Sequence, residues 1–175
     1  MPASLRGVLN FLYALSGWLA GGALVVTLLL VASGILLRPM GWYLRGADDY
    51  AAYAVGAAGF FALTPAWRAG AHIRITVLVD RLKGGASQWW ARAILGVAAL
   101  TATLIAWSCL RLPWQSWMIH DVSPGVDATP LWIPQLGLAG GAVMFALAVW
   151  DSALSAWRTP GASLDGTGEE SVHGQ

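Results

Sequence analysis

The side chains that could carry chemistry in this chain are few and scattered. There is one cysteine, Cys109, and there are three histidines, His72, His120 and His173. A single cysteine allows neither an intrachain disulfide nor a cysteine metal cluster. His72 has no second histidine, cysteine or carboxylate beside it at helical spacing, as a zinc site would require. The sequence therefore predicts no catalytic, cofactor or metal site, and we expect that the protein is not an enzyme.

The composition is far from that of a soluble domain. Hydrophobic residues make up 57% of the 175 residues and charged residues only 11%, whereas a typical globular chain is about 25% charged. The formal net charge is +1, so the overall charge does not indicate a nucleic-acid partner. This balance is typical of a chain whose solvent is a lipid bilayer.

Long intervals without charge divide the chain into four candidate membrane helices. The intervals cover residues 11–37, 50–67, 93–110 and 128–150. A helix that crosses the hydrocarbon core needs about 20 mostly apolar residues. One such interval could be a buried helix of a soluble protein, but four of them leave too little charge for a water-exposed surface. We predict an all-α membrane protein with a single four-span domain over residues 1–158 and a disordered cytoplasmic tail over residues 159–175.

The lysines and arginines predict the orientation in the membrane. Seven of the ten fall in the amino-terminal tail, the segment between the second and third intervals, and the carboxyl-terminal tail. Loops rich in lysine and arginine stay on the cytoplasmic side. Both termini are therefore expected in the cytoplasm.

Glycines spaced four residues apart predict close packing of helices. Gly17 and Gly21 lie in the first interval, Gly137 and Gly141 in the fourth, and Gly56 lies in the alanine-rich second interval. Small residues let two membrane helices approach each other closely. We expect these glycines at helix-packing faces or at contacts with a partner protein.

The segment between the second and third intervals, residues 72–82, has an ambiguous pattern. Its apolar residues alternate as in a strand but also fit one face of a helix. An isolated strand at a membrane surface would leave its backbone groups unpaired, so an interfacial amphipathic helix is favoured. Polar residues of this segment and the adjoining Lys83 would face lipid headgroups or a partner. These residues are His72, Arg74, Asp80, Arg81 and Lys83.

Three runs of the sequence resemble one known family. Residues 68–82, with His72-Ile-Arg, resemble the cytoplasmic loop of the small membrane subunits of TRAP transporters, the DctQ-like family. Residues 123–135 resemble the entry of that family into its fourth helix, and residues 46–50 resemble the acidic start of its second helix. The outer boundary of the fourth helix would then be marked by Pro130, Trp132, Pro134 and Gln135. Many members carry an arginine early in the second helix, where this chain has Tyr53.

The resemblance implies a role in a tripartite, ATP-independent transporter of the bacterial inner membrane. In this family a large membrane subunit moves the substrate with a sodium gradient, and a soluble periplasmic protein delivers that substrate, usually an organic acid. The small subunit is a scaffold bound to the large one. The family implies no cofactor for it, and the glycines and loop residues named above become candidate contacts with the large subunit.

Two other functions fit the sequence less well. A four-helix redox protein that carries haem or quinone would need axial histidines inside its helices, and His72 and His120 fall in predicted loops on opposite sides of the membrane. A self-sufficient channel would need a polar pore lining, which the predicted spans do not offer.

Overall fold

The computed structural model describes residues 3–42, 45–70, 85–125 and 128–158, and almost all of this part of the chain is helical. The long helices are α1 (Ala3–Leu37), α2 (Ala47–Arg68), α4 (Gly85–Met118) and α5 (Trp132–Arg158), and a short 3-10 helix, η1 (Arg38–Met40), follows α1. Within the described ranges the only β pairing is an isolated bridge between Val122 and Pro130. The prediction of an all-α protein is confirmed for the described residues.

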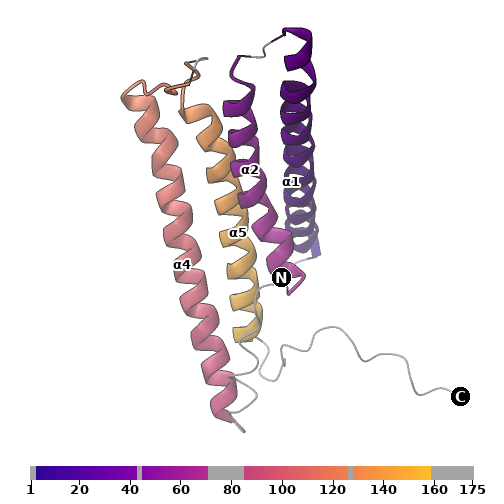
Figure 1. Ribbon diagram of the computed structural model, residues 1–175. Coiled ribbons are helices and arrows are strands. Elements are labelled where there is room, and N and C mark those ends of the chain that lie inside the picture. The colour runs from indigo at the N-terminus through magenta and orange to yellow at the C-terminus, as the bar shows by residue number, and fades with distance from the viewer. Residues whose placement is uncertain (1–2, 43–44, 71–84, 126–127, 159–175) are drawn as a thin grey trace, which may run out of the picture.

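The four long helices stand side by side in a row rather than in a square bundle (Figure 1). α2 packs against α1 and α5, and α5 also packs against α4, so the order across the row is α1, α2, α5, α4. α1 ends and α5 begins at the upper end of the row as Figure 1 draws it, and α1 begins and α5 ends at the lower end. α1 and α4 are therefore edge helices, each with one side that no other described helix covers.

Three of the described helices are long and apolar enough to cross a membrane. These segments are Arg6–Met40, Arg92–Met118 and Trp132–Trp157. α2 has 22 residues, about 33 Å of helix, which is sufficient length. Its hydropathy is lower because it is built largely of alanine and glycine, with Asp48 and Asp49 in its first turn. A helix covered on two sides by its neighbours needs fewer bulky apolar side chains toward lipid.

α4 is longer than the uncharged interval that predicted it. The interval covers residues 93–110, whereas the helix has 34 residues and continues through Pro113 to Met118. Charged residues limited the interval, but Arg92 and Arg111 do not end a helix. Arginine is a good helix former, so the backbone continues past both.

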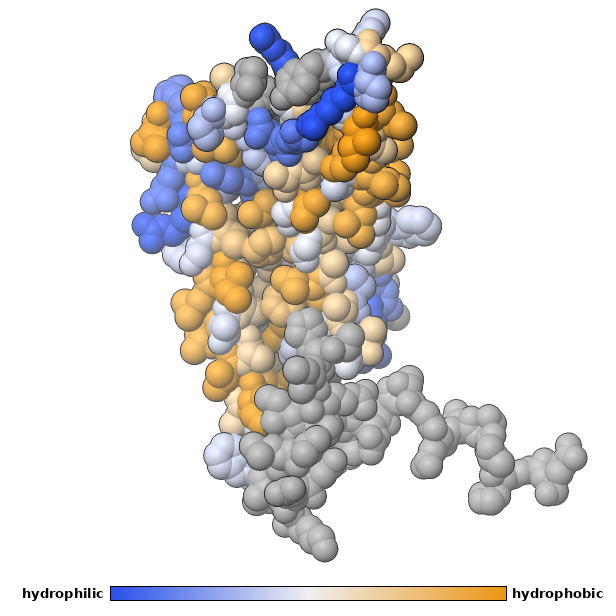
Figure 2. All heavy atoms as spheres, viewed as in Figure 1, coloured by the Kyte–Doolittle hydropathy of each residue, from blue (hydrophilic) through white to orange (hydrophobic). Residues whose placement is uncertain are grey.

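Alanine dominates the contact between α4 and α5. One buried cluster joins Ala99 and Ala102 to Val149 and Ala153, and a second joins Ala106, Cys109, Ala139 and Ala142. Such short side chains let the two helix backbones approach closely, which favours dispersion contacts in a membrane. Bulky apolar side chains cover the outside instead. Figure 2 shows one such face, where orange apolar side chains cover the middle and most hydrophilic ones lie near the upper end.

Candidate functional site

The structure places two glycines of α5 directly against α2. A Cβ atom added to Gly141 would lie 2.7 Å from the carbonyl carbon of Phe60 and from the backbone nitrogen of Phe61. A Cβ atom added to Gly137 would lie 2.9 Å from the Cβ atom of Ala57. Real Cβ atoms do not approach other atoms this closely, so the two helices meet at a distance that only glycine allows at these positions.

The other glycines selected from the sequence have more space. A Cβ atom on Gly56 would make an ordinary contact of 3.5 Å with Leu138, and one on Gly17 would lie 4.0 Å from the ring of Pro65. Gly21 has nothing within 4 Å. The structure therefore brings the α5 pair and Gly56 to the contact between α2 and α5, and leaves Gly21 away from the other described helices.

A proline inside α2 creates a polar link to α1. Pro65 has no N–H group, so the carbonyl of Phe61 lacks its usual partner four residues later. The hydroxyl of Ser16 on α1 donates a hydrogen bond of 2.7 Å to that carbonyl, and Ser16 is fully buried. Lipid offers no hydrogen bonds, so a freed carbonyl in a membrane helix needs a partner of this kind. The sequence analysis did not identify this link, although a proline inside a predicted span is its visible signal.

A polar cluster joins three helices near the lower end of the row. The guanidinium of Arg68 lies 4.7 Å from the ring centre of Tyr13, which is buried. The Tyr13 hydroxyl lies near Asp151 of α5, but no hydrogen bond of ordinary geometry forms there. Beside it, the indole N–H of Trp67 donates to the hydroxyl of Ser152 over 3.0 Å. Asp151 thus lies near the hydroxyl of Tyr13 on α1.

Two tyrosines of α2 hold the connection between α4 and α5. The hydroxyl of Tyr53 donates to the Ser123 hydroxyl over 2.7 Å, and the hydroxyl of Tyr50 lies 2.9 Å from that of Thr129. The backbone N–H of Ser123 donates to the Thr129 carbonyl over 2.8 Å. This bond joins the two ends of the connection between α4 and α5. Tyr53, which stands in place of the arginine common in the resembling family, is therefore part of a neutral hydrogen-bond network.

The residues predicted at the boundary of the fourth helix lie at the start of α5. Trp132 is its first residue, Pro134 falls in its first turn, where no N–H group is required, and Pro130 precedes it. The ring of Trp132 meets that of Trp117 edge to face, with 5.2 Å between centres. The side-chain oxygen of Gln135 is buried without a hydrogen-bond partner.

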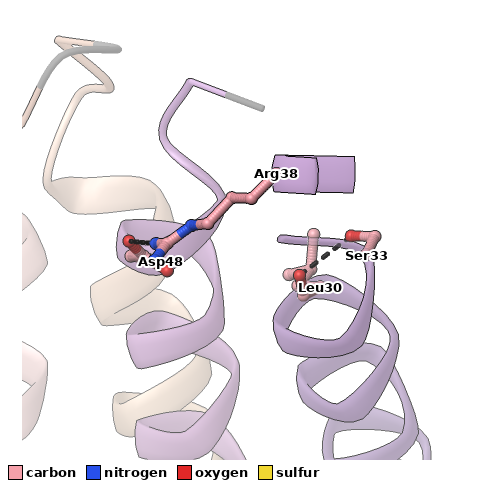
Figure 3. Close-up of polar contacts among 4 residues, drawn as sticks. All are labelled: Leu30, Ser33, Arg38 and Asp48. Carbon is pink, nitrogen blue, oxygen red and sulfur yellow. Dashed lines mark hydrogen bonds and ion pairs between the residues drawn. The ribbon is translucent and has the colours of Figure 1, made fainter. Parts of the chain in front are cut away.

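The acidic start of α2 is only loosely tied to η1. Gly46 occupies the position before the helix, and no side chain caps the helix there. Asp48 forms an ion pair with Arg38 (Figure 3), and both side chains are mostly exposed. The guanidinium nitrogen and the carboxylate oxygen are 3.9 Å apart. An exposed pair at this distance contributes about 1 kcal/mol or less. The sequence analysis predicted the place of these carboxylates but not this partner.

Polar side chains within the helices mostly bond to their own backbone. Thr27, Thr101 and Thr103 each donate to the carbonyl four residues earlier, and Ser33 donates to the carbonyl of Leu30 (Figure 3). The indole of Trp150 on α5 donates to Thr103 over 2.8 Å. In the described residues no group of three histidine, cysteine, aspartate or glutamate side chains could hold a metal ion.

The predicted interfacial helix lies outside the described residues. This includes all five of its selected side chains, which are His72, Arg74, Asp80, Arg81 and Lys83. Their role as headgroup or partner contacts remains a prediction.

Comparisons with known proteins supply the context for this arrangement. No curated protein and no solved structure matches the chain. One family model does match, and it covers residues 27–159, well over half of the chain. The chain therefore belongs to the DctQ family, the DctQ component of tripartite ATP-independent periplasmic transporters.

Proposed function

We propose that this protein is the non-catalytic small membrane subunit of a bacterial importer. It crosses the inner membrane four times with both termini in the cytoplasm, and it binds a large membrane subunit that moves the substrate. A periplasmic binding protein delivers that substrate, an organic acid anion, and a sodium gradient drives its uptake. The family match supports a role as a transporter component, and the orientation follows from the distribution of lysine and arginine.

The main support for the scaffold role is that polar side chains inside the helices form hydrogen bonds to the backbone of their own helix. A chain that bound a carboxylate and sodium near the middle of the membrane would present broken helices or free polar groups there. Here the hydroxyls of Thr27, Thr101 and Thr103 are engaged by carbonyls of their own helices. The interior between α4 and α5 is filled by alanine. This use of the three hydroxyls and the alanine packing support a role in packing rather than in substrate coordination.

The row of helices also suits binding beside a larger protein. In a square bundle each helix packs against two others, so only narrow outer surfaces face the membrane. A row of four helices instead presents two broad faces and two edges to the membrane (Figure 1). A partner can therefore bury a large area of this subunit without altering its internal contacts.

Co-purification and reconstitution test the proposal. A tagged copy expressed with its neighbouring genes should recover a large multi-span protein in detergent. In liposomes with a sodium gradient, organic acid uptake should require both membrane subunits and the binding protein. Uptake by this chain alone, or recovery of no membrane partner, would contradict the proposal.

A further inference from the structure

α4 has one side that no other described helix covers. It packs against α5 alone, through Ala99, Ala102, Ala106 and Cys109. Its opposite side carries large side chains that are more than half exposed, at spacings of three and four residues. These are Val97, Leu100, Leu104, Trp107, Trp114 and Met118. Arg111 fills the remaining place in this series and is also exposed. We call these seven residues the α4 outer face.

The spacing of the α4 outer face is that of a helix–helix contact surface. Alternation of three and four residues averages 3.5, the repeat that keeps one stripe of a helix against a partner helix over several turns. A shallow hollow of about 550 Å³ lies on this side, lined by Trp107, Leu110, Arg111, Trp114, Gln115 and Met118. A hollow between rows of side chains is what a ridge of another helix fills.

Arg111 is the unusual member of this face. It lies seven residues before the end of α4, about 10 Å along the helix axis. Among the described residues it makes no ion pair and no hydrogen bond. An ionised side chain on a membrane helix is costly unless it meets a partner, and this one points away from its own bundle. The described residues supply no counter-charge for Arg111.

The outward side of α1 is different. It exposes Leu24, Leu28 and Ile35 among other apolar residues, and no charge lies between Arg6 and Arg38. α1 also exposes a tryptophan, Trp18. Of the two edges of the row, only the α4 edge carries a charge within its series of large exposed side chains.

We propose that the α4 outer face binds a membrane helix of the large subunit, and that an aspartate or glutamate of that helix pairs with Arg111. This inference rests on the proposed function. A carboxylate on that helix would meet the Arg111 guanidinium within the hollow, which Arg111 lines together with Trp107 and Trp114. The α4 edge of the row is then the assembly edge of the complex.

Charge reversal at Arg111 tests the pairing. The tagged chain is expressed with the large subunit as the wild type, Arg111→Glu, Arg111→Lys and the matched control Arg45→Glu, which reverses an exposed arginine outside the α4 outer face. Recovery of the large subunit per tagged chain should fall about tenfold or more for Arg111→Glu. It should stay near the wild-type value for Arg45→Glu and be intermediate for Arg111→Lys.

A photo-crosslinking residue in an otherwise wild-type chain gives a second measurement that does not depend on how Arg111→Glu folds. Placed at Leu104 it should label the large subunit, and placed at Leu28 on α1 it should not. If the wild type recovers the large subunit but Arg111→Glu recovers it equally, this inference fails and the proposed function stands. Crosslinks from Leu104 only to lipid or to a second copy would also overturn it. Failure of the wild type to recover any large subunit would overturn both.

Discussion

The hydroxyl of Ser16 on α1 donates a 2.7 Å hydrogen bond to the carbonyl of Phe61 on α2, the carbonyl that Pro65 leaves without its helical partner. The proline therefore does not merely weaken α2. It exposes an acceptor at the contact between two helices, and the neighbouring helix supplies the donor. Pro65 thus fixes the position along the axis of α2 at which α1 packs against it.

Replacement of Ser16 by alanine should destabilise the protein through the unpaired Phe61 carbonyl. We expect a loss of about 1–2 kcal/mol, measured as a lower unfolding temperature or an earlier transition in a denaturing detergent. Thr27→Ala is the control, because the Thr27 hydroxyl bonds within its own helix. The cost of Ser16→Ala should shrink in a Pro65→Ala background, where the residue at position 65 again supplies an N–H group. An equal cost in both backgrounds would contradict this account.

Gly141→Ala should disrupt the contact between α2 and α5. The added Cβ atom would lie 2.7 Å from the backbone of Phe60, and a backbone cannot move aside as the end of a long side chain can. We expect a destabilisation of about 2 kcal/mol or more. Gly21→Ala provides the matched control, because nothing lies within 4 Å of its Cβ position. Equal tolerance of both changes would argue against the close approach at Gly141.

Tyr53→Phe should loosen the connection between α4 and α5. The substitution keeps the ring but removes the donor to Ser123, which is buried, and a lost hydrogen bond of this kind costs about 1 kcal/mol. Hydrogen exchange over residues 119–131 should become faster. Tyr50→Phe should have a smaller effect because its hydrogen bond to Thr129 is exposed. Unchanged exchange in Tyr53→Phe would show that the connection is held by other contacts.

The sequence predicted the helices better than their contacts, for a physical reason. Apolar intervals locate membrane helices because the bilayer sets a minimum length, but they do not show where a helix ends, as the extension of α4 past Arg111 demonstrates. Glycine spacing alone gave no distinction between Gly141, which touches α2, and Gly21, which does not. That difference depends on which helices are neighbours. The link from Ser16 to Phe61 needed the same knowledge, since its two residues are far apart in the chain.

The position of α2 in the membrane leads to the last prediction. α2 lies between α1 and α5, and about 33 Å of helix separates the residues at its ends. If it spans the bilayer, a cysteine at exposed Met40, the last residue of η1, and one at exposed Ala69, the first residue after α2, lie on opposite sides of the membrane. In a Cys109→Ala background, an impermeant maleimide added to intact spheroplasts should label Met40→Cys. Ala69→Cys should react only after the membrane is opened, because the excess of lysine and arginine predicts that this end lies in the cytoplasm. Labelling of both sites from the outside would show that α2 does not cross, and the four-span topology would then have to be abandoned.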